Sequence, residues 1–254
     1  SIARAGEDLG FEIISFSDHI VIPKSIEPEY PYSVSGEYYG GSNRDYVEML
    51  TTLSFLISQT KKARLLTAVM IMPHRPPMLT AKMLTTIDVL SKGRLEFGCG
   101  IGWMNEEFVA TGAPPFEERG AVTDEFIMAI KELWTSDNPD YDGKYCRFSD
   151  VDFLPRTVQQ PHPPIWIGGE SPPAIRRAAR LGDIWFPLGA NPRFPMATPE
   201  QMSNGISRLH QSAENIGRNP SEIGIAYIAY QYQQPEPVVL NGKRERFTGT
   251  PEQI

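Results

Sequence analysis

The sequence is short of cysteine, of long hydrophobic runs and of positive charge, and each shortage excludes a class of protein. Two cysteines, Cys99 and Cys146, cannot build a disulfide framework in 254 residues, and their positions suggest no metal site. No apolar run approaches the roughly 18 residues of a membrane span, and no signal peptide is visible. The net charge of −7 gives a nucleic-acid partner no electrostatic support. We therefore expect a cytoplasmic protein in a reducing setting, with neither a membrane nor nucleic acid as its partner.

Short apolar segments alternate with segments of helical periodicity along the chain. Alternation of this kind predicts an α/β fold with a parallel sheet and helices outside it. Six visible units, and one missing at each end, would make eight, so we favour a (β/α)8 TIM barrel over an open doubly wound sheet. One incomplete domain over residues 1–254 is expected, with an insertion at about 137–163 that holds a hairpin near 143–152. The expected strands are 11–17, 64–70, 95–97, 164–167, 183–186 and 223–230.

The stretch Arg94–Trp103, RLEFGCGIGW, predicts a short strand that runs into three alternate glycines, Gly98, Gly100 and Gly102. Bare backbone is needed where the main chain adopts a positive φ or lies close to a flat ligand. A planar cofactor over this turn is one interpretation, and glycines that serve packing alone are the other. The spacing is GxGxG and the turn does not open the first unit, so it departs from the dinucleotide fingerprint GxGxxG.

Two pairs of polar residues follow predicted strands. Asp18 and His19 come after the strand at 11–17. Histidine titrates near neutral pH and can exchange a proton with a reacting oxygen, while Asp18 could orient it or bond a cofactor ring. The alternative is a pair in a solvent-facing loop. His74 and Arg75 follow the next strand, where a cation could hold an anionic tail, but we expect both side chains to be solvated.

Two predicted helix starts carry groups that suit the positive end of a helix dipole. Residues 168–172, GGESP, join a strand to a helix that Ser171 caps. Free backbone N–H groups there predict a phosphate site, although an ordinary loop has the same pattern. Glu106 and Glu107 lie after the glycine turn and are expected as plain first-turn acids.

In this order the segments resemble the bacterial luciferase-like family (the LLM class) of flavin- or coenzyme F420-dependent oxidoreductases. The resemblance covers most of the chain and is strongest for the subgroup usually predicted to use coenzyme F420, a deazaflavin carrier of hydride. It implies a (β/α)8 barrel that lacks here its first strand and its last helix and strand. It rests on the motifs LGFEIISFSDHI (9–20), LLTAVMIMPHRPPMLTAKMLTTIDVLSKGRLEFGCGIGWMNEEFVATG (65–112), QQPHPPIWIGGESPPAIRRAARLGDIWFP (159–187) and NPRFPMATPE (191–200).

The resemblance also assigns residues to a cofactor ring in the barrel mouth. Asp18 and His19 match the pair that contacts the ring and transfers a proton in F420-dependent members. Trp103 stands where some F420-dependent dehydrogenases have a catalytic glutamate, which puts acid–base chemistry at that position in doubt and leaves Glu106 as only a possible substitute. The other residues implied are Ala68 and Val69 at a bulge with a non-prolyl cis peptide, Gly100, Ile101, Gly102 and Trp103 along the ring and ribityl chain, and Gly168, Gly169 and Glu170 at the phosphate.

These assignments predict an oxidoreductase that moves hydride between coenzyme F420 and a small organic substrate. His19 would give or take the proton, with Asp18 as its orienter. An FMN-dependent monooxygenase that uses reduced flavin and O2 is the alternative enzyme, and a non-catalytic barrel that binds a flavin-like ligand is the alternative outside enzymes. We expect no metal and allow for a homodimer. The long loop 23–44 is expected to supply part of the substrate wall through Tyr30, Tyr32, Tyr38 and Tyr39.

Overall fold

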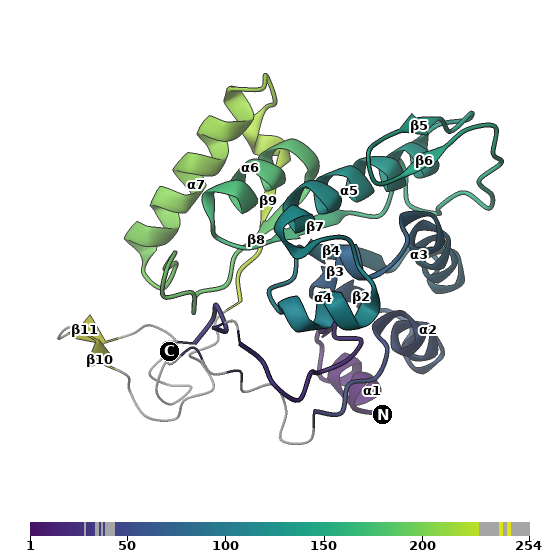
Figure 1. The fold of residues 1–254 in the computed structure, drawn as a ribbon. Helices are drawn as coiled ribbons and strands as arrows, with labels where there is room; N and C mark the ends of the chain where they lie inside the picture. Colours follow the sequence, from purple (N-terminus) through teal and green to yellow (C-terminus); the bar gives the residue numbers. More distant parts are fainter. Residues whose placement is uncertain are drawn as a thin grey trace. The chain divides into compact units, whose positions relative to one another are not determined.

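A computed structural model describes residues 1–27, 29–33, 36, 38, 44–228, 239–240 and 243–244. The chain divides into two compact units. The first comprises Ser1–Pro28 with Gly40–Ile165, and the second comprises Glu29–Tyr39 with Trp166–Ile254. Figure 1 traces the elements of both units along the chain. No helix of the described residues has both the length and the apolar character that crossing a membrane requires.

Parallel strands form the centre of the first unit. Strand β1 (Ile13–Phe16) pairs with β2 (Arg64–Thr67), and β2 pairs with β4 (Leu95–Gly100). Strand β3 (Met70–Ile71) pairs with the last residues of β4. Since all these pairings are parallel, the carboxyl ends of β1, β3 and β4 lie at the same edge of the sheet.

Helices connect these strands and bury their apolar faces. The helix α3 packs against both α2 and α5, and the indole Nε1 of Trp134 on α5 donates to Thr85 Oγ1 on α3 at 2.8 Å. The periodicity is confirmed for Leu50, Leu53, Leu84 and Ile87, which are buried, whereas Leu79 and Leu90 of α3 are exposed. The elements are α1 (Ile2–Asp8), α2 (Met49–Gln59), the 3-10 turn η1 (Met72–His74), α3 (Pro77–Ser91), α4 (Asn105–Thr111), the 3-10 turn η2 (Phe116–Glu118) and α5 (Arg119–Thr135).

The predicted strands of the first unit are present with different bounds. The strand expected at 64–70 is interrupted, because the Ala68–Val69 peptide is cis and separates β2 from β3. This confirms the non-prolyl cis peptide that the family resemblance implied. The predicted hairpin is also present, formed by β5 (Tyr141–Asp142) and β6 (Arg147–Phe148), so it begins and ends earlier than expected.

The alternate glycines belong to β4 and its continuation, and their bare backbone is used by protein neighbours. A Cβ on Gly98 would overlap the carbonyl oxygen of Thr67 on β2. A Cβ on Gly100 would lie 2.6 Å from Cγ2 of Val69. Gly102 has φ +78°, and its Cβ would lie 2.7 Å from a ring carbon of Phe108. Packing alone therefore requires glycine at all three positions, which favours the second interpretation of the motif.

The second unit contains a further set of parallel strands. Strand β7 (Ile165–Gly168) pairs with β8 (Ile184–Phe186), and β8 pairs with β9 (Gly224–Ile225). The strand predicted at 223–230 is therefore shorter than expected, with one further bridge from Leu188 to Ile228, and its last two residues lie outside the described part. The remaining elements are α6 (Pro172–Leu181), α7 (Pro199–Glu214), the 3-10 turn η3 (Pro220–Glu222) and the antiparallel pair β10 (Val239–Leu240) and β11 (Lys243–Arg244).

Candidate active site

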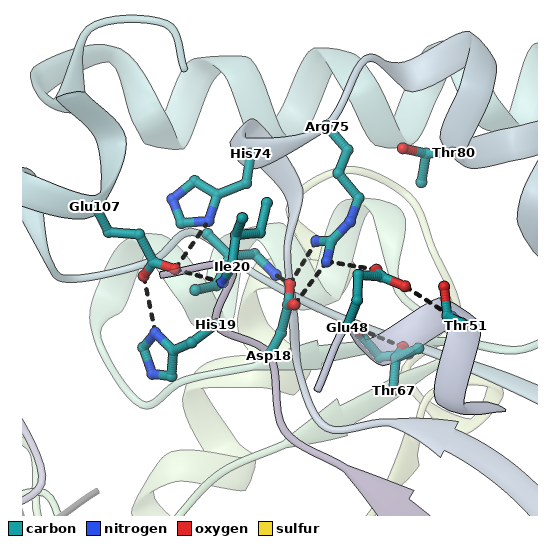
Figure 2. Close-up of polar contacts among 12 residues, drawn as sticks. Asp18, His19, Ile20, Glu48, Thr51, Thr67, His74, Arg75, Thr80 and Glu107 are labelled. Atoms are coloured by element: carbon teal, nitrogen blue, oxygen red, sulfur yellow. Dashed lines mark hydrogen bonds and ion pairs between the residues drawn. The ribbon is translucent and has the colours of Figure 1, made fainter. Parts of the chain in front are cut away.

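Buried polar side chains gather at the carboxyl ends of the strands of the first unit (Figure 2). Asp18 and His19 follow β1, and only 4% and 8% of their surfaces are exposed. His74 and Arg75 come after β3, and Glu107 lies in the first turn of α4, after β4. The expectation that His74 and Arg75 are solvated is wrong, because the side chains of these two residues are 0% and 10% exposed. Parallel strands bring these separate segments to one edge.

Asp18 forms an ion pair with Arg75 and does not bond to His19 in any contact described. Its Oδ2 accepts from Arg75 Nη1 at 2.7 Å and from the Ile71 N–H at 2.9 Å, and its Oδ1 accepts from Arg75 Nη2 at 2.8 Å. The same Nη2 donates to Glu48 Oε1 at 2.9 Å, while Glu48 caps α2. We call Asp18, Arg75 and Glu48 the Asp18 cluster. The predicted role of Asp18 as orienter of His19 is therefore wrong, because its oxygens are used to join β3 and α2 to the end of β1.

Glu107 is the carboxylate that His19 contacts. Its Oε2 lies 2.8 Å from His19 Nδ1, and its Oε1 accepts from the N–H groups of Ile20 at 2.7 Å and Val21 at 3.3 Å. Its side chain is 0% exposed, so the prediction of a plain first-turn acid is wrong for Glu107. Its neighbour Glu106 instead accepts from the Glu27 N–H at 2.8 Å.

His74 shares the same carboxylate without a hydrogen bond to it. Its Nδ1 lies 3.8 Å from Glu107 Oε1, and its ring meets Phe108 edge-on at 4.7 Å between centroids. Among the described residues neither of its ring nitrogens has a hydrogen-bond partner. Burial holds the pKa of His74 below its ordinary value, although Glu107 and Asp18 act in the opposite direction. His74 is therefore neutral at neutral pH, and we call His19, Glu107 and His74 the His19 cluster.

The charge of Glu107 determines where His19 carries its proton. Burial by itself would raise the pKa of the Glu107 carboxyl, but the hydrogen bond and charge of His19 outweigh it and hold that pKa below its ordinary value. An ionised carboxylate only accepts hydrogen bonds, so this contact favours a proton on Nδ1 of His19.

A half-exposed strip of residues lies at the same edge of the sheet as the His19 cluster. It comprises 68–69, between β2 and β3, and 100–103, at the end of β4, and every one of these residues is half-buried while strands β2, β3 and β4 are otherwise mostly buried. Val69 covers Gly100, so the two segments touch. The apolar side chains of the strip suit a flat ring, and the assignment of Ala68, Val69, Gly100, Ile101, Gly102 and Trp103 to a cofactor stays a prediction.

The glycine turn of the second unit has few free donors for the predicted phosphate. The N–H of Gly169 donates to the Phe186 carbonyl at 3.3 Å, and Ser171 Oγ accepts from the Ala174 N–H at 3.4 Å. Residues 172–173 are both proline and have no N–H to offer. Backbone donation by Gly169 and by the first turn of α6 is therefore contradicted, while donation by Gly168 and Glu170 stays a prediction.

Glu170 has a structural environment of its own. Its side chain is buried and accepts from the Leu188 N–H and, at 2.9 Å, from Asn191 Nδ2. Burial raises its pKa above the ordinary value, although these two hydrogen bonds act against the shift. Glu170 thus fastens the segment after β8 to the end of β7.

The described residues also bear on the predicted tyrosine wall and on groups of metal-ligating side chains. Tyr30 meets Tyr32 and Tyr38 edge-on, with centroids 5.6 and 5.2 Å apart, and Tyr39 lies outside the described residues. Their role as a substrate wall stays a prediction. In the part of the chain that the structure describes, no three His, Cys, Asp or Glu side chains are grouped to hold a metal ion.

The sequence is similar to a known protein family and to characterised enzymes within it. The chain matches the family model described as luciferase-like monooxygenase over residues 1–234. The FMNH2-dependent dimethylsulfone monooxygenase of Pseudomonas putida is 33% identical to it over 212 residues, which are 80% of this chain and 58% of that protein.

Solved structures show the same fold. Monooxygenase RslO1 from Streptomyces bottropensis superposes with a TM-score of 0.69 at 28% identity, covering 90% of this chain and 63% of its own. The coenzyme F420-dependent tetrahydromethanopterin reductase from Methanopyrus kandleri has a TM-score of 0.67 at 20% identity, with 89% and 60% covered, and its likeness concerns the fold alone. The α/β fold with a mostly parallel sheet is confirmed, and its structural neighbours are luciferase-like barrel enzymes. The chain spans less than two thirds of the length of these three relatives.

Proposed function

The chain belongs to the luciferase-like monooxygenase family, whose members are flavin- or F420-dependent oxidoreductases, and we propose that it uses reduced FMN and O2 to oxygenate a small organic substrate. The observation that carries the proposal is the His19 cluster at the same sheet edge as the half-exposed strip of 68–69 and 100–103. The choice of FMN is supported by the 33% identity to an FMNH2-dependent enzyme, against 20% to an F420-dependent one. This reverses the preference for F420 that the sequence motifs suggested.

Each part of the site has a chemical task in this proposal. FMN, when bound, supplies the electrons that activate O2. The strip of 68–69 and 100–103 offers half-exposed apolar side chains to the flat ring. Nε2 of His19 exchanges a proton with the reactants, and Glu107 holds the ring of His19 in place. The Asp18 cluster fixes the strand ends from which these groups project.

Hydride transfer with coenzyme F420 is the second candidate. It is supported by the match of Asp18 and His19 to the pair found in F420-dependent members, since a buried histidine suits proton exchange beside either ring. A non-catalytic binder is the third, and the polar pairing of a buried histidine with a carboxylate argues against it.

Anaerobic titration with each cofactor tests the proposal. Reduced FMN should bind with a Kd in the micromolar range, and F420 at least about tenfold more weakly, which is about 1.4 kcal/mol. With reduced FMN and O2, a substrate panel that begins with dimethyl sulfone should give an oxygenated product. A variant with His19→Asn, run in parallel, corrects for the O2 that free reduced flavin consumes. Tighter binding of F420, or F420 reduction by an alcohol panel without O2, would instead establish the second candidate.

A further inference from the structure

We propose that Glu107 is the positioning residue of this site: it fixes the proton of His19 on Nδ1 and so makes Nε2 the atom that exchanges a proton with bound reactants. The proposal rests on the proposed function for the identity of those reactants. The arrangement of hydrogen bonds around Glu107 stands without it.

One carboxylate holds both the ring and the backbone of the segment after β1. Glu107 Oε2 meets His19 Nδ1 at 2.8 Å, while Oε1 accepts from the N–H groups of Ile20 and Val21 at 2.7 and 3.3 Å. These contacts join residues 87 and 88 positions apart in the sequence. The ring of His19 therefore cannot turn without losing a hydrogen bond that is buried from water.

The same glutamate links His19 to the half-exposed strip. Glu107 lies in α4, four positions after Trp103, the last residue of the strip. A ligand that moves the end of β4 would move the start of α4 and with it the carboxylate on His19. Nε2 is thus placed relative to the surface on which the proposed ring lies.

Asp18 cannot take this role, because Arg75 compensates its charge. Arg75 donates to both oxygens of Asp18, at 2.7 and 2.8 Å. Glu107, in contrast, has no arginine or lysine among its described contacts and meets two imidazoles. It is therefore the carboxylate that an imidazolium at His19 would neutralise, which stabilises the protonated ring during a reaction.

His74 does not compete for Glu107 while it is neutral. Its Nδ1 is 3.8 Å from Oε1, beyond hydrogen-bond distance, and the charged and titratable groups that face it are Glu107, Asp18, Arg75 and His19. Its burial leaves it uncharged, so the stronger contact of Glu107 at neutral pH is the one to His19.

Replacing Glu107 by glutamine should change which ring nitrogen of His19 carries the proton. The N–H groups of Ile20 and Val21 require an acceptor, so the amide oxygen of the new side chain should face them. Its NH2 group then faces His19, and Nδ1 must become the acceptor. Glu107→Gln should therefore move the proton of His19 from Nδ1 to Nε2.

Nitrogen-15 NMR of the histidine rings measures this directly, because the chain has only four histidines. The unaltered protein should show a proton on Nδ1 of His19, Glu107→Gln should show it on Nε2, and Glu107→Asp should retain the original form. Glu106→Gln, a neighbouring glutamate that contacts Glu27, is the matched control and should leave the His19 tautomer unchanged. With reduced FMN, Glu107→Gln should lower kcat by on the order of 10²–10⁴-fold while the Kd for FMN changes less than about twofold.

Two outcomes would overturn the proposal. One is a neutral His19 in the unaltered protein whose single ring proton is on Nε2, which can be measured even if Glu107→Gln does not fold. The other is a Glu107→Gln variant whose kcat and pH profile equal those of the unaltered protein. Absence of any FMN-dependent turnover, with the proton found on Nδ1 in the NMR spectra, would count against the proposed function and support the positioning role.

Discussion

Both edges of the sheet in the first unit carry buried charges, and they use them differently. At the amino ends of the strands, Arg64 at the start of β2 pairs with Glu96 on β4 and donates to Gln159 Oε1 at 2.6 Å. Asp88 accepts from the N–H groups of Val158 and Gln159 at 2.7 and 3.1 Å and from Gln159 Nε2 at 2.8 Å. The pair of Arg64 and Glu96 joins β2 to β4, and the contacts of Val158 and Gln159 fasten the segment before β7 to α3 and the sheet.

At the carboxyl ends, the two clusters differ in how completely their polar groups are hydrogen-bonded. The Asp18 cluster is saturated by two carboxylates, a guanidinium and a backbone N–H. The His19 cluster leaves both nitrogens of His74 without a hydrogen bond among the described residues, and the half-exposed strip lies at the same edge. The contrast shows that burial of charge alone does not mark an active site. Incomplete hydrogen bonding beside an accessible surface is what separates the carboxyl edge from the amino edge.

The largest effect on stability should come from Asp18→Asn. Among the described residues, this change leaves the guanidinium of Arg75, whose side chain is 10% exposed, with the half-exposed Glu48 as its one ionic partner. Removing one member of a buried ion pair costs about 4 kcal/mol. Urea unfolding should show this loss, and a cost no greater than that of Asp88→Asn would mean that the Asp18 cluster does not hold the carboxyl edge together.

Gly98→Ala should lower the free energy of unfolding by nearly as much, for a steric reason. The new methyl group would overlap the Thr67 carbonyl oxygen, and it would lie 3.3 Å from Leu66 Cδ1. Forcing β2 and β4 apart costs about 3 kcal/mol. The control is Gly112→Ala, where φ is +67° but nothing lies within 4 Å of the new carbon, so only about 1 kcal/mol is expected. Equal unfolding free energies for the two variants would show that the strands do not need the glycine for close packing.

Asp88→Asn tests the amino edge and should have a smaller effect. One amide group cannot accept the three hydrogen bonds that Asp88 accepts, because its NH2 would face a donor of Val158 or Gln159. We expect a loss of about 2 kcal/mol in the unfolding free energy. Turnover below the melting range should stay within about twofold of the unaltered protein. A large loss of kcat would contradict the view that the amino edge contributes to stability and not to turnover.

The smallest expected effect is the pH dependence of stability that comes from Glu7, whose carboxylate binds the turn before β2. Its carboxylate accepts from the N–H groups of Ala63, Lys62 and Lys61, and these bonds lower its pKa from 4.5 to about 2. Since the pKa in the folded state is depressed, the contribution to stability is present above pH 4.5 and is lost as the pH falls toward 2. Carbon-13 NMR of the carboxyl group should find Glu7 still ionised at a pH of about 3. A midpoint near 4.5 would show that the three N–H groups do not hold the charge.

The sequence predicted that polar residues collect at the carboxyl edge but not which of them contact one another there. Asp18 and His19 were found because polar residues that follow an apolar strand collect at the carboxyl edge of a parallel sheet. Their partners were missed because the contacts of Glu107 and Arg75 span 88 and 57 positions of sequence. A first-turn glutamate has the same pattern whether it faces water or a buried histidine.

The glycines show a second limit of sequence patterns. Three alternate glycines establish that side chains are excluded, but only the neighbours show what excludes them. Here Thr67 and Val69 do so, which the spacing alone could not distinguish from a ligand. The six strands and their parallel pairing were predictable because apolar segments and helical periodicity are local properties.

The most direct test of the account is the turnover of His19→Asn with reduced FMN, O2 and the best substrate of the panel. Asparagine can still donate to Glu107 from the position of Nδ1, but it has nothing at the position of Nε2. We predict that kcat falls by on the order of 10²–10⁴-fold. The Kd for reduced FMN should change less than about twofold, and the unfolding free energy by less than about 1 kcal/mol. Unaltered turnover in a folded, FMN-bound variant would contradict the assignment of proton exchange to His19 and of the active site to the carboxyl edge.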